Sequence, residues 1–382
     1  MKTRGLYIHI PFCAKKCGYC DFTSFVGNGT QIDDYLSYLD KEFSLYKAGG
    51  LIDDIETIFI GGGTPSILSA GQLERLFSII GENVDLSKLR EYTMESNPGS
   101  LTRDKLELMK AGGLNRLSIG LQASQDHLLK FLERIHTYEE FLESYRLARL
   151  VGFDNINIDL MFAFQGQTFE DWRETLERVV SLEPDHISAY SLIIEEGTRF
   201  FNMYEDGSLT DYDEDEYVQM YRYTIDYLAD KGYGQYEISN FAKQDRECRH
   251  NLIYWDDREY YGLGLGSSGY LGGKRYTNYK DMFNYYEKLD AGERPIDFEE
   301  TISNREKLNE YLILGLRKIE GISRTKYLDR LKNIDEDKYK ENIEIINSYI
   351  GSGHIIQEGD HIRLSQTGLE ISDTISLDLL LY

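Results

Sequence analysis

Short β-branched or aromatic runs alternate with amphipathic stretches, and this alternation restricts the fold more than any other feature. Helical spacing of apolar residues is found at Asp33–Lys47, Ala70–Ile80, Arg103–Ala111, Thr137–Leu150 and Phe169–Ser181. Strands are expected at Leu6–Ile10, Thr57–Ile60, Tyr92–Glu95, Arg116–Leu121, Asn155–Phe162 and His186–Ile194. Strand and helix in alternation predict an α/β fold with a parallel sheet, either doubly wound or a partial (β/α) barrel.

Polar residues at the ends of the expected strands favour the barrel. Glu95 ends the third strand, Gln122 follows the fourth, Asp159 lies on the fifth, and Tyr190 lies on the sixth. The segment Gly61–Pro65, with the sequence G-G-G-T-P, follows the second strand. In a parallel barrel the carboxyl ends of all strands face one mouth, so these groups are expected to meet at one site.

Three of the four cysteines, Cys13, Cys17 and Cys20, fall in the stretch C-A-K-K-C-G-Y-C after the first strand. Bunched cysteines are a poor disulfide framework and suit a metal site in a reducing compartment. Tetrahedral zinc would need a distant fourth ligand such as His9 or Cys248. A [4Fe–4S] cluster held by three cysteines would leave one iron open to another ligand. The spacing leaves both alternatives open and favours the cluster.

Charge and hydropathy limit the partners and the compartment. The formal net charge is −24, so the chain is expected to repel nucleic-acid phosphates, and no nucleic acid is predicted as a partner. The apolar runs are short, so no transmembrane segment is predicted, and the N-terminus lacks the features of a secretory signal. A cytoplasmic protein is therefore expected.

The pattern divides the chain into three parts. Residues 1–200 are expected to form the barrel, residues 201–299 an extension, and residues 300–382 a small winged-helix-like domain. In this last part, three helical stretches precede two alternating strands joined at Glu358–Asp360, which is a hairpin signal. The acidic charge favours packing or partner docking over DNA binding for this domain.

The motifs together resemble the radical S-adenosylmethionine (SAM) superfamily. Y-I-H-I-P-F-C, F-I-G-G-G-T-P-S, E-S-N-P-G, R-L-S-I-G-L-Q and N-I-D-L-M-F are most similar to the family of oxygen-independent coproporphyrinogen III oxidase and the haem chaperone HemW. The resemblance covers nearly the whole chain. It implies a partial (β/α)6 barrel in which Cys13, Cys17 and Cys20 ligate a [4Fe–4S] cluster and SAM chelates the fourth iron.

The same resemblance implies roles for further residues. Tyr7 and Tyr19 would contact SAM, and Glu95 would line the same pocket. Gly62, Gly63 and Thr64 would receive the methionine part of SAM. Three positions match residues that contact a second SAM in the oxidase, namely Gln122, Arg134 and Asp159. Taken singly, each could equally have a structural role. Gln122 could form a hydrogen bond in the barrel interior, Arg134 could belong to a surface ion pair, and Asp159 could cap a strand end.

Three features favour the HemW branch over the oxidase. The oxidase pattern has a further cysteine where this chain has Phe22, and it has an N-terminal extension where only twelve residues precede Cys13. The stretch H-N-L-I-Y-W at residues 250–255 resembles a motif associated with HemW. The branch implies haem as bound cargo, haem-acceptor proteins as partners, and a cluster that acts as a switch. It also allows a homodimer.

The haem site is predicted at this motif. His250 would ligate or help to hold haem, with Tyr254 and Trp255 packing on the porphyrin and Cys248 as an alternative ligand. The sequence does not decide whether the chain is an enzyme. The alternatives are an oxidase that uses SAM radical chemistry on a porphyrinogen and, less favoured, an interaction protein stabilised by zinc.

Overall fold

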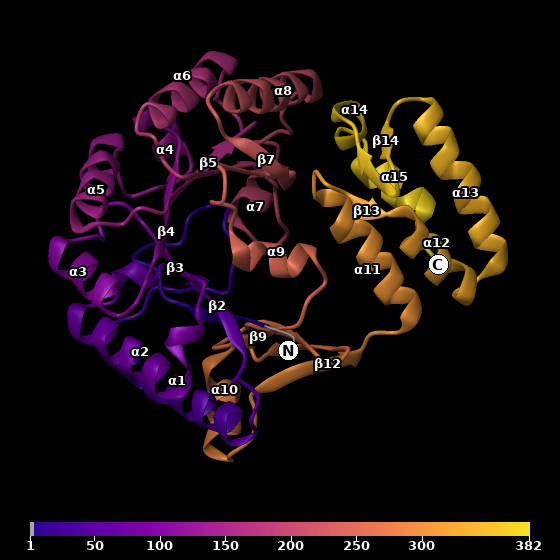
Figure 1. Ribbon diagram of the computed structural model, residues 1–382. Helices are drawn as coiled ribbons and strands as arrows, with labels where there is room; N and C mark the ends of the chain where they lie inside the picture. The colour runs from indigo at the N-terminus through magenta and orange to yellow at the C-terminus, as the bar shows by residue number, and fades with distance from the viewer. Residues whose placement is uncertain (1–3) are drawn as a thin grey trace.

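A computed structural model describes residues 4–382, and its centre is a set of parallel strands in chain order (Figure 1). These strands are β1 (Arg4–Ile10), β2 (Ile55–Gly62), β3 (Glu91–Ser96), β4 (Arg116–Gln122), β5 (Ile156–Phe162) and β6 (His186–Ser191). The crossover helices are α1 (Gly29–Ala48), α2 (Ala70–Asn83), α3 (Arg103–Ala111), α4 (Asp126–Phe131), α5 (Tyr138–Val151) and α6 (Phe169–Val180). Short 3₁₀ turns lie at η1 (Pro65–Ile67) and η2 (Leu86–Lys88).

The side-chain alternation of each strand separates a helix-facing core from an interior face. On β1, Leu6, Ile8 and Ile10 are fully buried in the main core, whereas Tyr7 lines an interior cavity. Figure 1 shows the crossover helices following the outer side of the sheet in an arc. Several of these helices begin with a capping box, as Ser69 and Gln72 do for α2, so the sequence itself sets where they start. This arrangement is the predicted partial barrel.

Short strands extend both edges of the parallel sheet. The full order is β12-β11-β10-β9-β1-β2-β3-β4-β5-β6-β8-β7. The additions are α7 (Arg199–Glu205), α8 (Glu214–Asp230), β7 (Gly234–Glu237), β8 (Asn240–Ala242), α9 (Arg249–Trp255), β9 (Tyr260–Leu263), β10 (Ser268–Leu271), β11 (Lys274–Asn278), α10 (Met282–Asp290) and β12 (Ile296–Thr301). β9 pairs in parallel with β1, and β10 to β12 continue as an antiparallel meander.

A smaller C-terminal domain has its own hydrophobic core and a three-stranded sheet in the order β13-β15-β14. Its elements are α11 (Asn304–Arg317), β13 (Ile322–Ser323), α12 (Arg324–Ile334), α13 (Glu336–Gly351), β14 (Ile355–Glu358), β15 (His361–Leu364), α14 (Gln366–Leu369) and α15 (Ser372–Leu379). The expected hairpin joins β14 to β15, with Gly359 at φ +61° in the turn.

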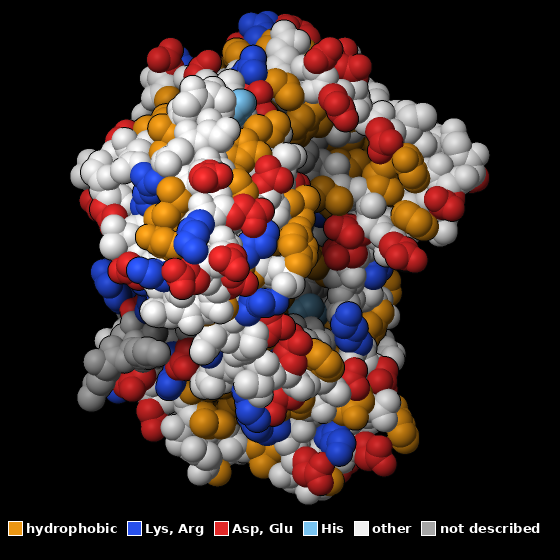
Figure 2. Space-filling model, turned by 90° about the vertical axis from the view of Figure 1, so that its right-hand side faces the viewer, with side chains coloured by type: hydrophobic (Ala, Val, Ile, Leu, Met, Phe, Trp, Pro, Cys, Tyr) orange, Lys and Arg blue, Asp and Glu red, His pale blue; other side chains and the backbone are white. Residues whose placement is uncertain are grey.

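The C-terminal domain is attached beside α9. Lys318, at the end of α11, forms a 2.7 Å ion pair with Asp256, and the Arg317 guanidinium lies 4.8 Å from the centre of the Trp255 ring. Figure 2 shows that this side of the molecule is hollowed, with hydrophobic side chains along the hollow and mixed charges around it.

Between residues 4 and 382, no helix is long and apolar enough to cross a membrane.

Candidate functional site

The loop that follows β1 holds the three bunched cysteines at the mouth of the barrel. Cys13 is buried, while Cys17 and Cys20 are partly exposed. The backbone fixes the loop at both ends, because Cys13 N–H donates to the Phe25 carbonyl at 3.0 Å and Phe200 N–H of α7 donates to the Gly18 carbonyl at 2.9 Å. The three thiols are thus presented together from one ordered loop.

A chain of hydrogen bonds joins two of these thiols through the ends of β2 and β3 and the loop between α4 and α5. The Thr64 hydroxyl lies 3.5 Å from Cys13 Sγ and accepts from Asn97 Nδ2 at 3.1 Å. Asn97 Oδ1 accepts from Arg134 Nη2 at 2.7 Å, and Arg134 Nη1 lies 3.8 Å from Cys17 Sγ. Donors and a guanidinium aimed at sulfur suit thiolates, and therefore a metal-bound state of the loop.

The glycine motif packs its backbone against the cysteine loop. Gly63 N–H donates to the Ile10 carbonyl at 2.8 Å, and Thr64 N–H donates to the Phe12 carbonyl at 2.7 Å. Gly62 N–H donates to the Glu95 carboxyl at 3.0 Å, and its φ of +108° favours glycine. Since these N–H groups are engaged, the motif can offer a ligand its carbonyl oxygens, which suit an ammonium group.

The two residues considered as a fourth zinc ligand are engaged elsewhere. His9 Nδ1 lies 3.0 Å from the Tyr7 hydroxyl, and its Nε2 lies 2.8 Å from the Thr23 carbonyl. Cys248 is fully buried, and its thiol donates to Glu91 at 3.4 Å. Among residues 4–382, no group of three His, Cys, Asp or Glu side chains is spaced to hold a single metal ion. Because His9 and Cys248 are both engaged, a tetrahedral ion held by the three thiols would need its fourth ligand from elsewhere.

A cavity of about 290 Å³ lies inside the barrel, and we call it the lumen cavity. Several residues singled out from the sequence line it, namely Tyr7, Gly62, Glu95, Asp159, His250 and Tyr254. Gln122, at φ +73°, and Arg134 lie outside it, and the side chains of both approach Gly120. Tyr19 packs edge-on against Phe200 at the cysteine loop, with its ring centre 6.2 Å away.

Burial shifts the pKa values of the two carboxyl groups that line the lumen cavity. Burial raises the pKa of Glu95 to about 8, with a further contribution from the charge of Asp159, so Glu95 is largely neutral at pH 7. Burial also raises the pKa of Asp159, while hydrogen bonds from Ser118 and Asn157 oppose this shift. A neutral Glu95 lowers the negative charge of this wall, which makes the wall able to face an anionic or zwitterionic ligand.

The H-N-L-I-Y-W motif forms α9, which lies across the amino ends of the parallel strands. Glu91, at the start of β3, accepts from the backbone N–H groups of Arg249 and His250 at 2.9 and 3.0 Å. His250 is fully buried, with Nδ1 2.8 Å from the Thr57 hydroxyl and Nε2 2.8 Å from the Tyr254 hydroxyl. Burial lowers the pKa of His250 to about 3, so the ring is neutral.

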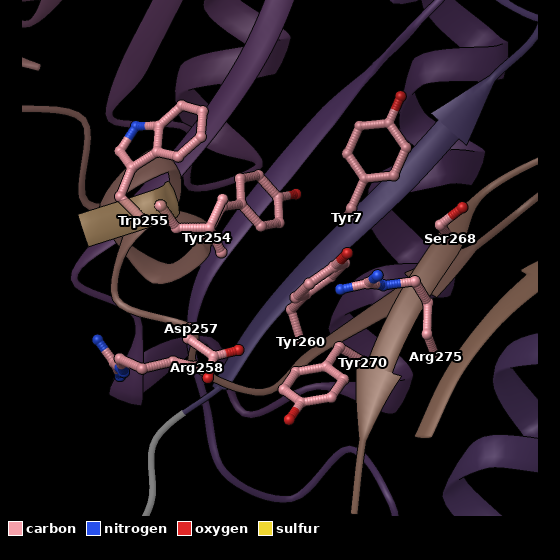
Figure 3. Close-up of a pocket in the computed structure, with 10 residues that line it drawn as sticks. Tyr7, Tyr254, Trp255, Asp257, Arg258, Tyr260, Ser268, Tyr270 and Arg275 are labelled. Carbon is pink, nitrogen blue, oxygen red and sulfur yellow. The ribbon is translucent and has the colours of Figure 1, made fainter. Parts of the chain in front are cut away.

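A second cavity of about 430 Å³, the aromatic cavity, lies between α9, the edge strands and α11. Its aromatic residues are Tyr7, Tyr254, Trp255, Tyr260 and Tyr270. Figure 3 shows the rings of Tyr7, Tyr254 and Tyr260 around a common space, with the guanidinium of Arg275 pointing toward Tyr260. Tyr7 and Tyr254 also line the lumen cavity, so the two cavities share a wall.

Sequence reasoning missed several of these residues. Asn97 lies in the E-S-N-P-G motif, and its place after a strand was the available signal. Tyr260, Tyr270 and Arg275 carried no signal, because they lie on short strands without a helix between them. Arg116 sits in the R-L-S-I-G-L-Q motif, and an arginine that opens an otherwise apolar strand was a sign that could have identified it.

Known proteins match this chain over most of its length. Residues 7–179 match the radical SAM superfamily. The haem chaperone HemW of Lactococcus lactis subsp. lactis is 39% identical over 375 residues, which cover 98% of this chain and 96% of that protein. HemW of Bacillus subtilis is 38% identical over 330 residues, covering 86% of each chain.

A solved structure confirms the fold. Coproporphyrinogen III oxidase (HemN) from Escherichia coli superposes with a TM-score of 0.85 over 99% of this chain and 90% of that chain, at 23% identity. The α/β partial barrel and the smaller C-terminal domain are therefore shared with that protein, and at this identity the likeness concerns the fold alone.

Proposed function

Because this chain belongs to the HemW family of radical SAM proteins, we propose that it is a haem chaperone, which binds a [4Fe–4S] cluster, SAM and haem and passes haem to acceptor proteins. The observation that carries this proposal is the position of the H-N-L-I-Y-W motif. Its Tyr254 and Trp255 line an aromatic cavity that shares a wall with the lumen cavity. A flat apolar ligand would therefore lie next to the cavity in which SAM is expected.

Three thiols of one loop would hold the cluster, with Cys13, Cys17 and Cys20 as ligands and one iron left for SAM. Bound there, the cluster would supply a redox-sensitive group that can act as a switch. The Gly62 and Gly63 carbonyls and the Glu95 carboxyl would receive the amino end of SAM, and Tyr7 and Asp159 would face the rest of it. Arg134 and Thr64 would orient the thiolates through the hydrogen bonds described above.

The aromatic cavity suits haem for physical reasons. Aromatic rings pack well on a flat macrocycle, and the cavity volume lies within the range of small-molecule sites. Arg275 forms a 2.9 Å ion pair with Glu310 and also borders the cavity, so a charged edge lies beside the rings. An amphipathic ligand with one apolar body and a few charged groups fits such a lining.

His250 has two candidate roles in haem binding. It ligates iron after its Nε2 bond to the Tyr254 hydroxyl opens, or it holds Tyr254 in position through that 2.8 Å bond. The two roles differ in a double-variant experiment. If His250 acts through Tyr254, then His250→Ala and Tyr254→Phe weaken haem binding alike, and the double variant is no weaker. If His250 is the ligand, only His250→Ala changes the Soret position.

Haem titration of the purified protein tests the function itself. A saturable Soret shift near one equivalent is expected, with His250→Ala weakening binding about tenfold if that interaction contributes about 1.4 kcal/mol. Binding no tighter than that of an unrelated acidic protein would refute the chaperone function. Turnover of coproporphyrinogen III would instead support the oxidase function. That alternative is less favoured, because this chain has Phe22 where the oxidase has a cysteine.

The compartment and assembly are part of the same proposal. A cytoplasmic location and a homodimer are both compatible with a protein that passes haem to an acceptor. Cell fractionation tests the first, and sedimentation of the cluster-loaded and cluster-free protein tests the second. Equal sedimentation in both states would argue against a cluster-controlled dimer.

A further inference from the structure

Arg116 is a buried cation with no direct hydrogen-bond or ion-pair partner for its side chain among the described residues. It begins β4 on the interior face, lines the lumen cavity, and is only 2% exposed. Within residues 4–382, no hydrogen bond or ion pair involves its guanidinium, and its Nε is buried without any partner. An unpaired charge is costly to bury, so such a residue calls for a partner that the chain itself does not provide.

The groups around Arg116 are committed to other contacts. Cys248, Glu91, Tyr236 and Asp159 interact with it electrostatically, but neither carboxylate forms an ion pair with it. Glu91 accepts from Cys248 and from the first N–H groups of α9. Asp159 accepts from the Ser118 hydroxyl at 2.8 Å and from Asn157 Nδ2 at 2.7 Å.

The histidines that border Arg116 supply no negative charge. His250 bonds to Thr57 and Tyr254, and His186 bonds to Asn157 at 2.6 Å and to the Tyr236 hydroxyl at 2.8 Å. Both rings are fully buried. The positive charge of Arg116 therefore points into the cavity with neutral rings at its sides.

We propose that Arg116 is the receptor for a carboxylate of a ligand held in the lumen cavity. The planar guanidinium can bind a carboxylate through two parallel hydrogen bonds. A singly charged carboxylate suits the cavity better than a phosphate, because Glu95 and Asp159 line the same space. This inference rests on the proposed function, which supplies two carboxylate sources, a haem propionate and the SAM carboxylate.

The haem propionate is the favoured source. Tyr7 and Tyr254 belong to both cavities, so a macrocycle against these rings borders the lumen on one side. Arg116 lies at the amino end of β4, on the same floor as His250, whereas the cysteine loop lies at the opposite mouth. SAM that chelates the cluster would have its carboxylate at that mouth, away from Arg116.

The test pairs ligand and residue changes. Reconstituted protein is titrated with ferric haem and with haem dimethyl ester, whose propionates are uncharged, and with SAM and decarboxylated SAM. We expect wild type to bind haem at least tenfold tighter than the ester, about 1.4 kcal/mol. Arg116→Gln should bind both haems alike and leave the SAM preference unchanged. Arg116→Lys, which keeps the charge, should retain part of the haem preference.

Arg103→Gln is the matched control, because Arg103 is exposed on α3 and pairs only with Glu107, so the haem preference should persist. If Arg116→Gln instead reduces the preference for SAM over decarboxylated SAM, the receptor role stands with SAM as the source. If neither preference changes in Arg116→Gln, the proposal is overturned. If the variants do not fold, equal binding of haem and ester by wild type overturns the haem assignment.

Failure of the proposed function gives a different result. Wild type would then bind neither haem form above the level of an unrelated acidic protein. In that case the SAM arm alone decides the role of Arg116.

Discussion

Replacing Gly63 by alanine tests the claim that the glycine motif holds the cysteine loop in place. A Cβ at Gly63 would lie 2.6 Å from the Phe12 carbonyl oxygen, 2.8 Å from Phe12 N and 2.9 Å from the Ile10 carbonyl oxygen. All three atoms belong to the backbone, so no side-chain rotation can relieve the contact. The end of β1 and the glycine motif must therefore move away from each other.

The expected cost follows from these contacts. Overpacking of this kind costs about 1–3 kcal/mol. Stretching the hydrogen bonds of Gly63 N–H and Thr64 N–H adds about 1 kcal/mol each. Alanine also lowers the conformational entropy of the unfolded chain, which offsets this loss of stability by roughly 0.4–1 kcal/mol. A net loss on the order of 2–5 kcal/mol in the free energy of unfolding is expected, on summing these contributions.

Two measurements check this prediction. Urea unfolding should show the loss of stability, and iron and sulfide analysis should show less cluster, because Phe12 precedes Cys13. Gly71→Ala on α2 is the control, since its Cβ would meet no atom within 4 Å and it should stabilise the helix by about 0.5–1 kcal/mol. A Gly63→Ala protein with wild-type stability and full cluster content would refute the reasoning.

Three further predictions concern the cluster, SAM and pH. Alanine at Cys13, Cys17 or Cys20 should abolish the cluster, which is measured as about four irons per chain. Cys248→Ala should keep the cluster, and its loss in that variant would contradict the three-thiol assignment. SAM should change the paramagnetic resonance spectrum of the reduced cluster. Gly62→Val should prevent this change, because a Cβ at Gly62 would lie 2.4 Å from the His9 ring. An unchanged wild-type spectrum at saturating SAM would count against SAM binding. The pKa of Glu95 is raised to about 8, so the folded state binds a proton more tightly than the unfolded state, and its contribution to stability is lost as pH rises from about 4.5 to 8. Glu95→Gln should therefore gain thermal stability relative to wild type between pH 5 and pH 8, and a constant difference across that range would show that Glu95 does not titrate there.

The sequence determined the parallel core and the cysteine loop, because both depend on local patterns. Apolar periodicity and capping boxes such as Ser69 with Gln72 define strands and helices from a few neighbouring residues. The three cysteines lie within one loop, so their proximity needs no distant contact. The hairpin at β14 and β15 was readable for the same reason, since its turn is a two-residue signal.

The edge strands and α4 were not predicted. β9, β10 and β11 have four or five residues each, too few for a clear alternation, and they form because a neighbouring strand offers free backbone groups. The two strands β7 and β8 are equally short. Their pairing is a property of the sheet edge and not of their own residues.

Only the tertiary structure decided what the interior positions do. The H-N-L-I-Y-W motif predicted that His250 ligates or helps to hold haem, and packing places His250 at the barrel floor with both ring nitrogens bonded. Arg116 looked like one residue of a conventional strand, and its lack of a partner depends on where Glu91 and Asp159 direct their own oxygens. Charge, burial and hydrogen-bond saturation are set by groups from five or more separate segments, and no local pattern specifies how those segments meet.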